Sequence, residues 1–528
     1  MDKLYSLMCT YYQKYLIIFF IIFWDFLFPN IIFQDYSVSN LREYELKSIL
    51  DSNIYPEIYD FSNIPVQSFS KIKSYNFFKK NKNLSFNPVF GLRYSYMGYE
   101  INPIGSFSPV IWITPGLQFN YITPIISPYS GFLFHVWGSF YKHSAYFLDK
   151  SEINKEFLIS QNFKPFEYQP YLSMEYFVKT EKPNWGIDFD ESQGGLRILS
   201  NNLKLIFGKF KSSYGPFQRG NLSLSLRTPS FPQFKIKYKQ LYNNKKYFDF
   251  TYFIGDLTSE IADSLLSTAY VNNELEINSR FPWIKRGVVY HRIDLHISKN
   301  LRIGLYEQLI YGARQTPWQY LIPINFYWSA QHSIGDFDNL QMGIDLDWIY
   351  NNRRTNFAFL IDEWAPFKTL DTENHHNWFA FQIGHTQIFD FIKRKLYFRF
   401  ESAIISPQIY EHKFPINQAY NQGYPIGYWT KGDAVDIWIV LTSLNEQKIS
   451  PRIEFEYTIL GEPIYEINRK FLNNISSIKQ KYSLIMNYKV NIFTNIEFHL
   501  SYLKNKNLKY NQKEIYDCIL SYKYNISY

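Results

Sequence analysis

The stretch Asp517-Cys-Ile-Leu-Ser-Tyr-Lys-Tyr-Asn-Ile-Ser-Tyr528, at the end of the chain, is where the fold is most legible. Apolar side chains occupy its even-numbered positions, and all but one of the odd-numbered positions are polar. Successive side chains of a β-strand point to opposite faces, so this period of two predicts a strand with one apolar face. Strands of soluble sandwiches alternate as well, so the neighbouring strands must decide the class.

The two preceding strands favour a membrane barrel. Apolar faces recur over 482–490 and 496–502 with a short connection between them, whereas the longer polar stretch 504–513 leads to the last strand. Outer-membrane barrels have short periplasmic turns and longer outer loops. The ending on Tyr528 also resembles that of barrels recognised by the barrel assembly machinery. We therefore predict a transmembrane antiparallel β-barrel with Tyr528 as its assembly signal.

Applying the same rule to the preceding residues predicts about eighteen strands, an even number that leaves both termini in the periplasm. Besides the three C-terminal strands, we predict strands at 110–121, 131–141, 169–178, 185–198, 202–210, 233–241, 246–254, 287–297, 301–311, 341–349, 355–363, 376–385, 396–404, 436–444 and 452–460.

The predicted lumen faces are polar. They carry Lys235, Lys237 and Lys239, Asp345 and Asp347, Arg399 and Glu401, and Arg452, Glu454 and Glu456. A lipid-facing Arg or Lys at mid-depth costs about 2–4 kcal/mol, which favours this alternation. Glu307 is an exception, because it falls among the apolar, lipid-facing positions of its strand. The strand 436–444 is apolar at both sets of alternate positions, so its register is not determined.

The N-terminal part predicts export. Lys3 and Lys14 precede an apolar stretch that is interrupted by Asp25 and Pro29, which fits a signal peptide over 1–34 better than a membrane anchor. Residues 35–109 are then a partly helical periplasmic segment and 110–528 the barrel in the bacterial outer membrane. The long connection 142–168 also falls on the periplasmic side and could help to close the barrel mouth.

Composition excludes several other functions. The net charge of +8 is spread along the chain without a dense basic block, so no nucleic-acid partner is expected. The two cysteines, Cys9 and Cys518, form no metal-binding spacing, and no cofactor is expected. Enzyme motifs are missing from the sequence, and we predict no catalytic residues. The pair His375-His376 is read as an interfacial or lumen pair rather than a metal site.

Several stretches resemble the Wzi family of outer-membrane capsule assembly proteins, including related gliding-motility barrels of Bacteroidota. One is Gly208-Lys-Phe-Lys-Ser-Ser-Tyr-Gly-Pro-Phe-Gln-Arg-Gly-Asn-Leu-Ser-Leu-Ser225, followed by Pro229-Ser-Phe-Pro232; another is Asn421-Gln-Gly-Tyr-Pro-Ile-Gly427. The family tends to carry W-G-P-G where this chain has Tyr214-Gly215-Pro216, with the second glycine displaced to Gly220. The family-motif residues here are Gly215, Pro216, Gly220, Pro229, Pro232, Gly423, Pro425 and Gly427.

The resemblance implies an eighteen-stranded barrel that holds capsular polysaccharide or exopolysaccharide at the cell surface without catalysis. We expect the outer loops to bind an anionic polymer through Arg219, Tyr424, Tyr428 and Trp429, because aromatic faces pack on sugar rings and arginine pairs with carboxylates. Trp283, Trp318, Trp328 and Trp364 also fall in or beside outer loops, either to stack on sugars or to form an interface girdle. A porin or channel is the main alternative, with a gliding or adhesion barrel within the same family and, less favoured, an outer-membrane enzyme. Expected partners are polysaccharide, membrane lipid and the assembly machinery, with the chain acting as a monomer.

Overall fold

The computed structural model describes fifteen stretches of the chain, which together hold the strands and three of the long connections between them. These stretches are 84–99, 106–124, 133–147, 178–179, 185–200, 202–225, 228–243, 246–263, 283–364, 377–391, 394–444, 449–462, 470–489, 494–507 and 513–524.

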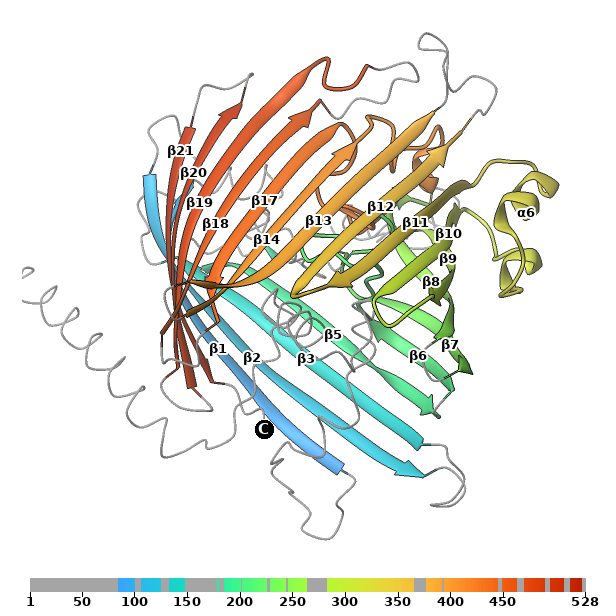
Figure 1. Ribbon diagram of the computed structural model, residues 1–528, viewed down its shortest axis with the longest axis horizontal. Coiled ribbons are helices and arrows are strands. Elements are labelled where there is room, and N and C mark those ends of the chain that lie inside the picture. Colours follow the sequence, from blue (N-terminus) through green and yellow to red (C-terminus); the bar gives the residue numbers. More distant parts are fainter. Residues whose placement is uncertain are drawn as a thin grey trace, which may run out of the picture.

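Almost all of the described elements are antiparallel strands of one sheet (Figure 1). The strands are β1 (Leu84–Tyr99), β2 (Ser106–Pro124), β3 (Leu133–Phe147), β4 (Val178–Lys179), β5 (Trp185–Leu199), β6 (Leu203–Phe210), β7 (Phe231–Asn243), β8 (Lys246–Ala262), β9 (Trp283–His296), β10 (Leu301–Gly312), β11 (Asn339–Tyr350), β12 (Arg353–Glu363), β13 (Trp378–Phe391), β14 (Arg394–Ile405), β17 (Ala434–Ser443), β18 (Ile449–Gly461), β19 (Ile475–Lys489), β20 (Thr494–Asn507) and β21 (Lys513–Tyr524). The connections contain η3 (Trp318–Leu321), α6 (Tyr327–Ser333), η5 (Pro415–Asn417) and the small hairpin of β15 (Tyr420–Asn421) and β16 (Tyr424–Pro425).

The sheet has nineteen strands, of which β4 has only two residues, so eighteen are long. Each long strand pairs with its neighbours in sequence order, β3 pairs with β5, and the last strand β21 pairs with β1 over Leu92–Met97. Every long strand among the described residues therefore has a partner on both sides, which is the pairing of a β-barrel, with β1 and β21 joined over a short segment.

One strand of the eighteen differs from the prediction. β1 lies inside 35–109, which the sequence assigns to the periplasmic segment. The predicted strand 169–178 lies outside the described residues except for Val178, which begins the two-residue strand β4. Apolar residues alternate along β1, but Pro88 and Gly91 interrupt the pattern and hide it. The barrel thus begins at Leu84 rather than at residue 110, and β2 and β3 run opposite to the predicted direction.

The reversal moves one predicted connection to the other end of the barrel. The turns after β5, β7, β9, β11 and β13 are short, whereas the connections after β6, β8, β10, β12 and β14 are long. The connection from β3 to β5, which includes 142–168 in the prediction, joins the end with the long connections. It is therefore on the outer side, because short turns face the periplasm. The signal peptide, Tyr528 and the His375-His376 pair lie outside the described residues.

The two faces of the described strands match a transmembrane barrel. Large apolar side chains are exposed on the outer wall, among them Ile293, Leu305, Trp348, Phe357, Phe381, Ile404, Ile453 and Tyr482. The opposite faces carry buried charges. An apolar exterior around a polar interior is stable only in lipid, so the chain is an outer-membrane β-barrel. No helix in the described part of the chain is long and apolar enough to cross a membrane.

Charged side chains of opposite sign pair on the interior wall. Arg292 contacts Asp294 and Asp345 at 2.6 Å each, and Arg302 contacts the same two carboxylates at 2.7 and 2.8 Å. Arg354 continues the row with Asp347 at 2.6 Å. The predicted lumen positions Asp345 and Asp347 are confirmed by this row. The pairing of opposite charges in this row explains how β9 to β12 can bury so many charged side chains.

Candidate functional site

Two long connections from the outer end of the barrel fold into its lumen. They are 211–230, between β6 and β7, and 406–433, between β14 and β17; together they are called the plug. Every described residue of 211–230 is buried, which is unusual for a connection at the rim of a barrel. In the connection 406–433 most residues are buried or half-buried, and only Lys413, Phe414, Pro415 and Lys431 are exposed. The lumen beside β7 to β18 is therefore filled by chain from the outer end.

The plug is built from the two motif segments on which the family resemblance rests. The backbone N–H of Ser225 donates to the carbonyl of Ile426 at 2.9 Å, and its hydroxyl donates to the carbonyl of Gly427 at 2.6 Å. The Thr228 hydroxyl reaches the carbonyl of Pro425 at 2.8 Å. The segments are about 200 residues apart in sequence, yet each supplies the hydrogen-bond partners of the other.

Glycine is required where the segments are closest. A Cβ at Gly427 would lie 2.4 Å from the carbonyl oxygen of Leu222, a backbone atom that cannot move aside. Gly215 has a φ of +141°, and a Cβ there would lie 2.2 Å from the Asn221 amide oxygen that accepts a hydrogen bond from the Phe217 N–H. The family-motif glycines thus allow the tight turn and the close approach inside the plug.

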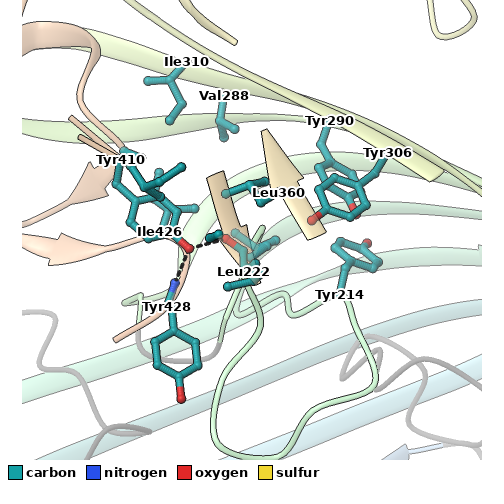
Figure 2. Close-up of a cluster of buried hydrophobic side chains, with 14 of the residues drawn as sticks. Tyr214, Leu222, Val288, Tyr290, Tyr306, Ile310, Leu360, Tyr410, Ile426 and Tyr428 are labelled. Carbon is teal, nitrogen blue, oxygen red and sulfur yellow. Dashed lines mark hydrogen bonds between the residues drawn. The ribbon is translucent and has the colours of Figure 1, made fainter. Parts of the chain in front are cut away.

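An apolar core joins the plug to the barrel wall (Figure 2). Tyr214 of the plug stacks on Tyr290 of β9, with ring centroids 4.9 Å apart. The hydroxyl of Tyr410 donates to the carbonyl of Leu222 and accepts a hydrogen bond from the N–H of Tyr428, at 2.7 and 3.1 Å. Burial of these large side chains contributes about 1.5–3 kcal/mol each, so the plug is an integral part of the fold.

A buried group of charges fixes the tip of the first connection. The Arg219 guanidinium contacts Asp436 at 2.9 Å and Glu456 at 2.7 Å, and it lies 5.0 Å from the centre of the Trp429 ring. Glu401 accepts the backbone N–H groups of Gln218 and Arg219 at 2.8 and 3.0 Å. Three wall carboxylates, from β14, β17 and β18, thereby hold one turn of the plug; we call this group the acidic latch.

The plug reaches far down the lumen. The side-chain amide of Gln218 donates to the Tyr397 hydroxyl at 2.9 Å. Tyr397 is close to the short-turn end of β14, which begins at Arg394. The connection 211–230 therefore starts at the outer end and approaches the periplasmic end. A second tether lies near the outer rim, where Arg286 of β9 donates to the backbone carbonyls of Ile416, Gln418 and Tyr420.

The structure corrects most of the predicted sugar-binding residues. Arg219 and Tyr428 are 1% and 0% exposed, and Tyr424 is also buried. The Tyr428 hydroxyl donates to Asp436 at 2.7 Å, so it belongs to the acidic latch. Trp429 is half-buried, and its ring N–H donates to the same carboxylate at 3.2 Å. These residues stabilise the plug, and three of the four cannot contact a polymer outside the barrel.

Other side chains of the plug do face outward. Lys413, Phe414 and Lys431 are exposed on 406–433, and we call them the mouth residues. Burial lowers the pKa of the neighbouring His412 to about 4, and burial also raises the pKa of Glu411. At the outer ends of β9 and β12, Trp283 and Trp364 are each 51% exposed. An aromatic ring flanked by cations can bind an anionic sugar polymer.

Within the described residues, no group of three or more potential ligands could hold a metal ion. The buried charges described above are paired with one another across strands. The buried charges of this part of the barrel therefore hold the plug, and the side chains that a ligand could contact are the exposed ones at the mouth.

No family model and no curated relative matches the chain. Among solved structures, it is similar to Wzi of Escherichia coli, described as an outer-membrane, carbohydrate-binding β-barrel of group 1 capsule assembly, with 12% identity, 83% of this chain and 84% of that chain covered, and a TM-score of 0.47. It is also similar to OccAB4 of Acinetobacter baumannii, with 10% identity, coverage of 84% and 98% and a TM-score of 0.45. OpdK of Pseudomonas aeruginosa, solved with vanillate, gives 8% identity, the same coverage and a TM-score of 0.45.

Proposed function

We propose that this barrel binds a polysaccharide at its outer mouth and retains it at the cell surface. The observation that carries the proposal is the plug, which fills the lumen beside β7 to β18 with a buried core and an acidic latch. A barrel filled in this way suits binding at its surface better than passage of a solute. The motif segments that resemble the Wzi family are the same two plug connections.

A channel is the alternative function. It requires a continuous polar path through the lumen, with charged side chains left available to solutes. In the described lumen, the acidic groups Glu401, Asp436 and Glu456 bind the plug instead. The channel function therefore depends on release of the plug, and the polysaccharide function does not.

We assign polymer binding to the mouth residues in place of the buried latch residues. Lys413 and Lys431 would pair with carboxylates of an anionic polymer, while Phe414 and Trp364, at the outer end of β12, would pack against sugar rings. Each contact is weak at an exposed site. Many barrels along one polymer would supply retention through multivalency.

The test uses polysaccharide extracted from the cells that make this protein, immobilised on a sensor surface. Wild-type barrel in detergent should bind it, and the double variant Phe414→Ala with Trp364→Ala should bind several-fold more weakly. Tyr350→Ala, an equally exposed aromatic at the short-turn end, is the matched control and should bind as wild type does. Binding of the double variant at the wild-type level would refute the assignment, and failure of the wild type to bind would refute the function.

A further inference from the structure

A third long connection, 313–338 between β10 and β11, folds outward over the barrel wall. Figure 1 shows α6 outside the ring of strands, on the side of β10 and β11. Val289 of β9 and Leu309 of β10 share the outward parity of the exposed wall residues Ile293 and Leu305, yet both are 0% exposed. They are covered by Tyr320, Tyr327 and Ala330 of this connection, which we call the outer flap.

Polar contacts hold the outer flap to the wall. The Glu307 carboxylate accepts the backbone N–H of Tyr327, at the start of α6, at 2.9 Å, and contacts the His291 ring at 2.8 Å. The other ring nitrogen of His291 faces the carbonyl of Pro323 at 3.2 Å. The Tyr252 hydroxyl donates to the carbonyl of Tyr320 at 3.1 Å. Glu307, the sequence exception on an apolar face, is therefore the anchor of the flap.

The position of Glu307 along its strand sets the depth of the flap. Glu307 is six residues from Leu301, where β10 leaves the periplasmic turn. At a rise of about 3.3 Å per residue and a tilt of about 40°, this separation is roughly 15 Å along the membrane normal. The lipid-facing band of such barrels is about 25 Å tall, so Glu307 and the first turn of α6 lie inside its outer half.

The side of the flap that faces away from the wall is apolar. Its exposed large side chains are Trp318, Leu321, Ile322, Ile324, Phe326 and Trp328, with Trp318 and Ile324 82% and 83% exposed. The sequence from Gln315 to Gln331 contains no charged residue. In water such a surface would be an aggregation hazard, whereas at this depth it continues the lipid-facing wall below it.

We propose that the outer flap is embedded in the outer leaflet of the membrane and that lipid acyl chains cover its apolar side. The flap thickens the wall beside β8 to β11, shields the Glu307–His291 pair from lipid, and places Trp318 and Trp328 on the membrane-facing surface. Its occupant is lipid, because the flap is continuous with the lipid-facing wall at Ile293 and Leu305 and lies within the apolar band.

The experiment measures the depth of single nitroxide labels in palmitoyl-oleoyl phosphatidylcholine vesicles. Cys9→Ser together with Cys518→Ser provides the background. Labels are placed at Ile324→Cys, with Leu305→Cys as the lipid-facing reference and Asp336→Cys as the reference on the same flap. Ile324 should be reached by oxygen far more readily than by a water-soluble nickel chelate, with a ratio close to that of Leu305 and several-fold above that of Asp336.

Two results would overturn the proposal. Nickel accessibility of Ile324 equal to that of Asp336 would place the flap in water. Low accessibility to both reagents would mean that protein, such as a second copy of the chain, covers it. Heat-modifiability on SDS gels verifies that each variant folds. If the Ile324→Cys variant does not fold, Phe326→Cys provides a second label position on the same apolar side.

Discussion

The connection 211–230 and the outer flap 313–338 leave the same end of the barrel and fold in opposite directions. The first enters the lumen, where Arg219 meets Asp436 and Glu456. The second folds over the outside, where Glu307 of the strand wall accepts the backbone N–H of Tyr327. The first holds two aromatic residues, Tyr214 and Phe217, whereas the flap holds six, so the more aromatic connection is the one outside the barrel. The comparison indicates that a connection packs against the face of the barrel wall whose side chains can pair with its polar groups.

The side chains on each face of the barrel wall determine the free-energy cost of folding a connection to the wrong side. Placing Arg219 against lipid would cost about 2–4 kcal/mol at mid-depth, and its three wall carboxylates would be left in the lumen without it. Placing the uncharged stretch 315–331 in the lumen would set apolar side chains against the row of charges on β9 to β12. Each connection thus has one face of the barrel on which it is stable.

The largest effect is expected from Arg219→Met. The substitution keeps an apolar stem but leaves Asp436 without the Arg219 cation and Glu456 with Lys481, 3.6 Å away, in its place. Loss of one partner from a buried ion pair costs about 3–5 kcal/mol. The plug should become cleavable by protease within 211–230, and the unfolding temperature on SDS gels should fall. Arg353→Met, at an exposed arginine, is the control and should change neither. A plug that stays resistant would show that the acidic latch does not hold it.

A smaller effect, confined to the outer flap, is expected from Glu307→Leu. The Tyr327 N–H loses its acceptor while the barrel wall becomes more apolar, and an unsatisfied buried donor costs about 1–3 kcal/mol. Protease should cut within 313–338 and leave 211–230 intact, and insertion into the membrane should be unchanged. Leu305→Ala, two residues away on the same face, should leave the flap protected. Equal cleavage of plug and flap would contradict their independence.

The smallest effect is a loss of plug stability at acid pH that depends on His412. Burial lowers the pKa of His412 to about 4, from 6.5 for an ordinary histidine. The plug therefore keeps its full stability above pH 6.5 and loses part of it as the pH falls towards 4. His412→Gln should remove this part of the acid destabilisation on SDS gels. His332→Gln, at an exposed histidine of the flap, should leave the acid profile as in the wild type; an unchanged profile in His412→Gln would refute the assignment.

Much of the barrel could be predicted from local sequence, and the site could not. Alternation predicted seventeen of the eighteen long strands and the lumen positions of Asp345 and Asp347, and it singled out Glu307. It missed β1, because Pro88 and Gly91 break the period of two. The plug leaves no local signal: Arg219 is separated from Asp436 and Glu456 by 217 and 237 residues. Read alone, an arginine in a long polar connection indicates exposure, and only the folded barrel brings its carboxylates to it.

The central claim is that the plug fills the lumen beside β7 to β18 and confines ligand binding to the mouth, and planar-bilayer recording tests it most directly. The account predicts that the wild-type barrel gives no stepwise conductance, whereas a variant in which residues 212–229 are replaced by a short Gly-Ser linker conducts, with both chains remaining heat-modifiable. Conductance of the wild type as large as that of the deletion variant would contradict the claim and favour the channel function.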